Sequence, residues 1–67
     1  MAAGKVRWFS DEKGFGFITP DDGGADLFAH HTALSGDACQ SLKQHQRVEF
    51  ELRPGTRGPR AANIRAL

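Results

Sequence analysis

Glycine and phenylalanine alternate after a lysine in the segment KGFGFI, residues 13–18. In an extended strand successive side chains point to opposite faces, so Phe15 and Phe17 share one face while Gly16 and Ile18 share the other. The two rings then lie about 6.6 Å apart along the strand, roughly twice the 3.4 Å repeat of stacked bases in a duplex. This spacing favours a polymer whose bases are pulled apart, because unpaired bases stack on protein aromatic rings.

The same pattern is also typical of a core strand, since aromatic residues at strand spacing usually belong to a core. Gly14 and Gly16 weaken that interpretation, because glycine inside a strand indicates a bend or the close approach of another backbone. Ile18 already supplies a core anchor on the opposite face. We therefore expect the two rings to lie on the surface.

A second segment, DLFAH at residues 26–30, repeats the arrangement. Asp26, Phe28 and His30 share one face, and the small aliphatic side chains Leu27 and Ala29 share the other. The aliphatic side is the natural core side, so we expect Phe28 and His30 beside the first two rings.

The chain has 67 residues, which predicts one domain over residues 1–67. A domain of this size buries only about 60% of its chain surface, so its stability is marginal and every exposed ring is lost to the core. Composition is that of a globular protein, with 39% hydrophobic and 25% charged residues. No apolar run approaches the roughly 20 residues that a membrane span needs, so no membrane is expected as a partner.

Two features predict a cytoplasmic protein. The N-terminal residues lack the layout of a signal peptide, since no apolar block follows the early charge at Lys5. Cys39 is the single cysteine, so no internal disulfide can form, which fits a reducing compartment.

The net charge of +1 says little about nucleic acid, but the distribution of charge says more. Lys5, Arg7 and Lys13 flank Trp8 and the phenylalanines, and four arginines gather near the C-terminal end: Arg53, Arg57, Arg60 and Arg65. A basic and aromatic patch on a nearly neutral body is typical of salt-sensitive nucleic-acid binding. The alternative is an ordinary solvated surface of mixed charge.

Five strands are predicted, over residues 4–10, 15–19, 26–30 and 47–53 and in a last segment that ends near Ala66. Residues 20–24 and 54–59 carry strong turn signals. The connection over residues 31–46 is predicted to hold one helical turn, Thr32–Leu34, ended by Gly36. Leu34 and Leu42 are expected to tie it to the core.

The core is predicted from the alternation of side chains. In residues 47–53 it places Val48, Phe50 and Leu52 inside, and in the last strand Ala62 and Ile64. The first strand is less regular, because strict alternation puts Trp8 on the side of Val6 and away from the binding face. A bulge or strong coiling, common in small barrels, would resolve this, and it leaves open whether Trp8 or Phe9 is buried.

Five short strands with one long crossover must close into a barrel or leave raw edges. The prediction is an all-β fold, a five-stranded antiparallel Greek-key barrel of oligonucleotide-binding (OB) type. In such barrels the face around strands two and three binds oligonucleotides, which is where the expected rings lie.

The sequence resembles the bacterial cold-shock protein family over nearly its whole length. The matching segments, in the family's order and spacing, are GKVRWF (4–9), KGFGFI (13–18), LFAHH (27–31), RGP (57–59) and AAN (61–63). The second and third look like the family's two ribonucleoprotein motifs. The resemblance implies an antiparallel five-stranded barrel that binds single-stranded DNA and RNA, acts as an RNA chaperone and regulates transcription or translation, with a link to the cold response.

The resemblance also implies the site residues. The base-stacking set carries over onto Trp8, Phe15, Phe17, Phe28 and His30. Basic and polar contacts carry over onto Lys5, Arg7, Lys13, Asp26 and Arg57. For Asp26 two roles stay open, either accepting hydrogen bonds from a base edge or binding Lys13.

Two positions depart from the family pattern, because His31 and Cys39 stand where the family usually has phenylalanines. Base stacking is worth roughly 1–3 kcal/mol per base, so we expect this end of the site, which includes His31, to hold its bases more weakly. His30 and His31 are expected on opposite faces, as neighbours on a strand. Because histidine gains charge in mildly acid solution, oligonucleotide affinity at fixed salt should rise as the pH falls.

Other classes of function fit the residues less well. His30, His31, Cys39 and His45 lack the paired spacing of a zinc site, and a Cys/His nucleophile needs an orienting third group. No helix is predicted after Gly14 and Gly16, so they are not a phosphate loop. We expect no enzyme activity, cofactor, metal or small-molecule substrate. The expected partners are single-stranded RNA and DNA, bound by a monomer, with strand exchange between two copies as an alternative state. A small barrel that binds peptides through its aromatic face is the rival function.

Overall fold

The computed structural model describes residues 2–34, 42–56 and 58–67 of the chain. Five strands and one short 3-10 helix are present: β1 (Ala2–Ser10), β2 (Phe15–Pro20), β3 (Leu27–His30), η1 (His31–Ala33), β4 (Arg47–Arg53) and β5 (Arg60–Ala66). All five predicted strands are confirmed, although β1 begins two residues earlier and β3 one residue later than expected. The predicted helical turn is η1. Gly36, which was expected to end it, lies outside the described residues.

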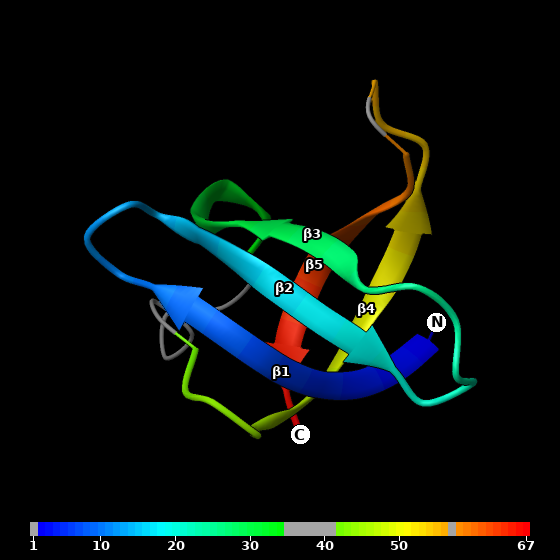
Figure 1. Cartoon of the computed structure of the whole chain (residues 1–67), viewed down its shortest axis with the longest axis horizontal. Coiled ribbons are helices and arrows are strands. Elements are labelled where there is room, and N and C mark those ends of the chain that lie inside the picture. The colour runs from blue at the N-terminus through cyan, green and yellow to red at the C-terminus, as the bar shows by residue number, and fades with distance from the viewer. Residues whose placement is uncertain (1, 35–41, 57) are drawn as a thin grey trace.

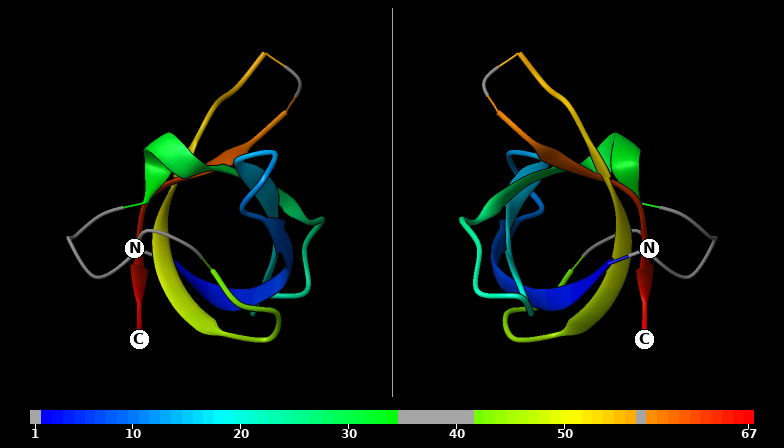
Figure 2. Two further views of the ribbon diagram at one scale, coloured as in Figure 1. Left: turned by 90° about the vertical axis from the view of Figure 1, so that its left-hand side faces the viewer. Right: turned by 90° about the vertical axis from the view of Figure 1, so that its right-hand side faces the viewer.

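The strands close into a barrel in the order β1-β2-β3-β5-β4, with β4 paired back onto β1 (Figure 1). The crossover after β3 carries the chain to β4 beside β1, and β5 then fills the place between β4 and β3. Figure 2 shows the closed ring, from which the described residues that link β4 to β5 project. The predicted five-stranded barrel is thus confirmed, with one correction. An entirely antiparallel barrel was expected, but β3 and β5 run in the same direction where they meet, so this contact is parallel. The other strand pairs are antiparallel.

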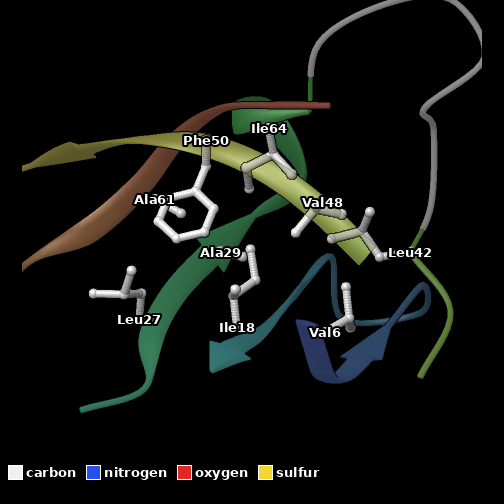
Figure 3. Packing of buried hydrophobic residues seen from close by; sticks show 9 residues of the cluster. All are labelled: Val6, Ile18, Leu27, Ala29, Leu42, Val48, Phe50, Ala61 and Ile64. Carbon is white, nitrogen blue, oxygen red and sulfur yellow. The ribbon is translucent and has the colours of Figure 1, made fainter. Parts of the chain in front are cut away.

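Small aliphatic side chains and one phenylalanine fill the interior of the ring (Figure 3). The core cluster consists of Val6, Ile18, Leu27, Ala29, Leu42, Val48, Phe50, Ala61 and Ile64. Leu42 is buried and Leu34 packs partly against the cluster, so both connect the crossover to the core as predicted. Burying these side chains is what holds the barrel closed, at about 25 cal/mol for each Å² removed from water.

The Trp8 side chain lies outside the barrel because β1 contains a bulge. Val6 is opposite Ile18, but Trp8 is opposite Phe17, so β1 has one residue more than β2 between these pairs. The extra residue reverses the alternation and turns Trp8 outward, where it is 39% exposed. Phe9 packs partly against the core. The bulge suggested by the sequence is confirmed, and Trp8 is the more exposed of the two aromatic residues.

Two inward positions were predicted wrongly. Leu52 is 57% exposed, since the described pairs of β1 with β4 end at Ala2 opposite Phe50 and β4 continues past them without that neighbour. In β5 the inward residue is Ala61 rather than Ala62. Glu49 pairs with Arg65 and Glu51 with Ala62, so β5 carries an extra residue between these pairs. Asn63, with a φ of 49°, lies at this irregularity and brings Ile64 back to the interior.

The first turn depends on a glycine. Gly14 has a φ of 77°, in the left-handed region, and its N–H donates to the carbonyl oxygen of Ser10 at 2.7 Å. This turn brings Phe15 opposite Ser10 and sets the register of β1 on β2.

The described part of the chain contains no helix that is long and apolar enough to cross a membrane.

Candidate nucleic-acid interface

Five rings from three neighbouring strands lie together on the outer side of the barrel. We call this group the aromatic face: Trp8 of β1, Phe15 and Phe17 of β2, and Phe28 and His30 of β3. The Trp8 ring centroid lies 5.7 Å from that of Phe15 and 5.4 Å from that of Phe17. Phe28 lies 5.7 Å from Phe15 in a stacked arrangement and 6.2 Å from His30. Phe17 also lies 5.9 Å from Phe28, so Trp8 and the three phenylalanines form one continuous group of contacting rings.

Strand register explains why these rings meet. Trp8 is directly opposite Phe17, and Phe17 is opposite Phe28, so these three rings form a row across β1, β2 and β3. Phe15 is opposite His30 in the next row on the same face. Because Ile18, Leu27 and Ala29 fill the inner side, the rings are held outward; Phe28 is 37% exposed.

The two neighbouring histidines touch, contrary to the prediction that they would diverge. Their ring centroids are 4.4 Å apart, because β3 ends at His30 and η1 begins at His31, which breaks the strand alternation. His30 Nδ1 accepts a hydrogen bond from the Thr32 backbone N–H and lies 2.8 Å from its hydroxyl. His31 Nδ1 is 3.2 Å from the Gly14 carbonyl oxygen, which can only accept, so this nitrogen donates.

Asp26 has partners other than the predicted Lys13. Its carboxylate accepts hydrogen bonds from Arg7 at 2.6 Å and from the Thr19 hydroxyl at 2.9 Å. The Thr19 hydrogen bond and then the Arg7 guanidinium hold the pKa of the Asp26 carboxyl below its usual range. Asp26 is therefore charged near neutral pH and holds Arg7 at the edge of the aromatic face.

The predicted basic residues are spread around the aromatic face rather than gathered on it. Lys5 and Arg7 line a hollow of about 460 Å³ that also contains the carboxylates of Asp21 and Asp26. Lys13 lies exposed in the turn between β1 and β2. Arg57, like the atypical Cys39, lies outside the described residues.

Sequence reasoning missed a hollow between the aromatic face and the chain that links β4 to β5. Its volume is about 610 Å³, and its described lining consists of Phe15, Phe17, Phe28, Gly55, Thr56, Gly58, Pro59 and Arg60. The clustering of arginines near the C-terminus was visible in the sequence. The proximity of Arg60 to Phe28 was not, since it depends on the pairing of β3 with β5.

The described part of the chain contains no group of three or more His, Cys, Asp or Glu side chains that could hold a metal ion. Outward-facing rings with basic side chains around them can stack on flat ligands and attract anions.

Comparison with known proteins agrees with this geometry. The model of the 'cold-shock' DNA-binding domain matches residues 2–67. The chain belongs to the cold-shock domain family. Its membership confirms the family resemblance and identifies the chain as a nucleic-acid-binding domain of a family that is not enzymatic.

Curated cold-shock proteins match the chain over almost all of its length. The cold shock-like protein CspA of Stigmatella aurantiaca is 51% identical over 67 residues, covering 100% of this chain and 98% of that protein. The probable cold shock protein A of Mycobacterium tuberculosis is 48% identical, with 100% of both chains covered. The cold shock-like protein CspG of Escherichia coli is 52% identical over 64 residues, covering 96% of this chain and 91% of that protein.

Proposed function

We propose that this cold-shock domain binds single-stranded RNA and single-stranded DNA by stacking unpaired bases on the aromatic face. Stacking reads the flat surface that every base has, so sequence specificity is low. In the cell the protein acts as an RNA chaperone that keeps transcripts unpaired and thereby regulates transcription and translation, including in the cold response. Residues 1–67 act as one binding unit, a cytoplasmic monomer.

One observation carries the proposal: the rings of the aromatic face lie outside the barrel, and other side chains fill its core. Phe50 is the single phenylalanine of the described core cluster. Trp8 and Phe28 are 39% and 37% exposed, although burying them would contribute more stability than any aliphatic side chain. A chain this short keeps such rings on its surface at the expense of its own core, which supports a binding role.

The geometry favours single strands over duplexes. In the row across β1, β2 and β3 the ring centroids are 5.4 Å apart for Trp8 and Phe17 and 5.9 Å apart for Phe17 and Phe28. Both distances exceed the roughly 3.4 Å between stacked bases of a duplex. A duplex presents its bases edge-on inside its grooves and cannot reach flat rings without unpairing. Bases of a flexible single strand can separate and lie on successive rings.

The test is a titration of Trp8 fluorescence with hexameric DNA and RNA, in which we expect quenching by single strands, weakened by salt, and none by duplex. Replacing Phe17 or Phe28 by alanine should lower affinity by about 1–3 kcal/mol. Leu52→Ala is the matched control, because Leu52 is 57% exposed but lies outside the aromatic face. Unchanged affinity in both phenylalanine variants would refute the proposal.

The rival function, a module that binds peptides through the same rings, gives a different result. Peptide binding would not follow the salt dependence of counterion release from a polyanion. A chain that binds proline- or aromatic-rich peptides but no oligonucleotide would favour the rival.

A further inference from the structure

The row of rings continues beyond the aromatic face onto two cations. Trp8, Phe17 and Phe28 are cross-strand neighbours, and Phe28 is in turn paired with Arg60 of β5. Arg60 is opposite Arg53 of β4. The outer side of the barrel therefore carries one line of residues in the strand order of Figure 1, with rings at the β1 end and guanidinium groups at the β4 end.

Arg60 is the member of this line whose charge is not satisfied within the described structure. Arg53 donates to the Glu51 carboxylate at 2.9 Å, and Arg7 and Arg47 form ion pairs with Asp26 and Asp21. No ion pair or hydrogen bond joins the exposed Arg60 side chain to any other described residue. Its guanidinium stays charged and has five N–H donors, so it can bind an anion from solution.

The surroundings of Arg60 suit a nucleotide. Arg60 lines the 610 Å³ hollow together with Phe15, Phe17 and Phe28. It also lines a hollow of about 180 Å³ next to His30, Thr32 and Asn63. Neither hollow has a carboxylate among its described lining residues, and the Glu51 carboxylate that accepts a hydrogen bond from Asn63 is paired with Arg53.

We propose that Arg60 forms a phosphodiester subsite at the β5 end of the row. A strand whose bases stack on Trp8, Phe17 and Phe28 places a further base in the larger hollow and the adjoining phosphate on Arg60. The inference rests on the proposed function, because it assumes that the strand runs along the rings. It adds a residue that sets the length of strand bound and the dependence of affinity on salt.

A phosphate explains the geometry better than the edge of a guanine base. Reading guanine requires a guanidinium held in one plane, with two donors aimed at O6 and N7. No described carboxylate or amide orients Arg60, whereas Arg7 and Arg53 are each held by an acid. A phosphate accepts hydrogen bonds from many directions and needs only charge nearby.

The experiment compares Arg60→Gln with Arg65→Gln in titrations of Trp8 fluorescence at several salt concentrations. Both variants lose one positive charge from β5, but Arg65 lies at the opposite end of the strand, opposite Glu49. For Arg60→Gln we expect an affinity about tenfold lower, as for a lost hydrogen bond to a charged group. The slope of log affinity against log salt should become shallower by about 0.7, the value for one phosphate of a single strand. Arg65→Gln should retain the wild-type slope.

Base composition and a second variant separate phosphate from base recognition. The loss in Arg60→Gln should be equal for oligo-dT, oligo-dC and oligo-rU, and Arg60→Lys should retain the slope because a point charge suffices for phosphate. A loss confined to oligonucleotides that contain guanine would overturn the proposal, as would an unchanged slope in Arg60→Gln. If wild-type protein binds no single strand at all, the proposed function itself fails; if it binds normally and only the Arg60 result is negative, the subsite alone fails.

Discussion

Asp26 is a carboxylate at the edge of a surface that we expect to meet a polyanion, and its two partners explain how it is tolerated. Thr19 and Arg7 both donate to it, which lowers its pKa and gives Arg7 a fixed position. The ion pair is exposed, with side-chain exposures of 65% for Arg7 and 27% for Asp26. Pairs of this kind contribute little stability, and their main effect here is to order Arg7.

We predict that Asp26→Asn is less stable than the wild type at pH 7 and that the difference disappears in acid. Because the pKa of Asp26 is lower in the folded protein than in the unfolded chain, its contribution exists above the ordinary aspartate range. It is lost as the pH falls through the lowered folded pKa. Urea unfolding at pH 7 and near pH 2 measures this. Asp11→Asn, in the exposed turn after β1, is the control, and an equal difference between wild type and Asp26→Asn at both pH values would contradict the prediction.

His31 is the described position at which the chain departs from the family pattern, and a ring substitution tests its effect. We expect His31→Phe to bind a hexamer more tightly, because a larger apolar ring adds stacking worth about 1–3 kcal/mol. The variant also loses the hydrogen bond from His31 Nδ1 to the Gly14 carbonyl, which should lower its folding stability by about 0.5–1.5 kcal/mol. Fluorescence titration measures both this variant and His31→Ala, which should bind no better than the wild type. Affinity in His31→Phe at or below that of the wild type would count against the weak-end hypothesis.

At the scale of the strand, Gly16 determines how closely β1 and β2 approach. A Cβ atom built at Gly16 would contact the Trp8 carbonyl oxygen and lie 2.6 Å from Phe9 Cα. Both neighbours are backbone, so neither can rotate away. The glycine is required because the β1 backbone at Trp8 and Phe9 lies against this position, next to the bulge that turns Trp8 outward.

We predict that Gly16→Ala loses about 1–3 kcal/mol of stability, as overpacked sites do, and also weakens oligonucleotide binding because Trp8 is displaced. Gly24→Ala is the control, since its Cβ would meet the flexible Asp22 carboxylate at 3.1 Å and should change stability by less than about 0.5 kcal/mol. Thermal unfolding and Trp8 fluorescence measure the two effects. If Gly16→Ala were as stable as Gly24→Ala, β1 and β2 could move apart here without cost, and the prediction would be wrong.

The two bulges show what side-chain patterns can and cannot predict. The irregularity in β1 was predictable, because strict alternation puts Val6 and Trp8 on the same side; the sequence left a bulge and strong coiling open, and the structure has the bulge. The irregularity in β5 was not, since Ala61 and Ala62 are identical and give no signal for which one points inward. Leu52 was placed inside because its residue type fits the core; its exposure depends on where β1 stops pairing with β4.

The positions of the candidate site residues were likewise predicted only in part. Placing Phe15, Phe17 and Phe28 on one face requires only the alternation within two strands and the turn between them. Placing Arg60 beside Phe28 requires the register of two strands separated by the whole crossover, which no local pattern encodes. The contact between His30 and His31 likewise depends on where β3 ends and η1 begins.

At the scale of the whole molecule, the strand pairs of the ring are unequal. The ladder of β1 on β2 extends from Gly4 to Ser10. In the described part of the chain, β3 and β5 meet at one registered pair, Phe28 with Arg60, and Leu34 just beyond β3 bridges to Ile64. Local opening begins where few hydrogen bonds and buried contacts must break, so the β3–β5 contact is where the barrel should open first.

Hydrogen exchange tests this prediction. We expect amides in residues 58–67 to exchange faster than those in residues 15–20, because β5 has only β4 as a fully paired neighbour. Equal protection in both segments would mean that the barrel opens only by global unfolding. The measurement uses the intact chain at neutral pH, with and without a bound hexamer.

The weak β3–β5 seam lies under the line of residues from Phe28 to Arg60. An oligonucleotide bound on both sides of this seam would bridge it. Opening the ring would then first require a base to dissociate from Phe28 or a phosphate from Arg60. The ligand would thus contribute to the stability of the barrel itself, and the complex would resist thermal unfolding and proteolysis chiefly at the β3–β5 contact.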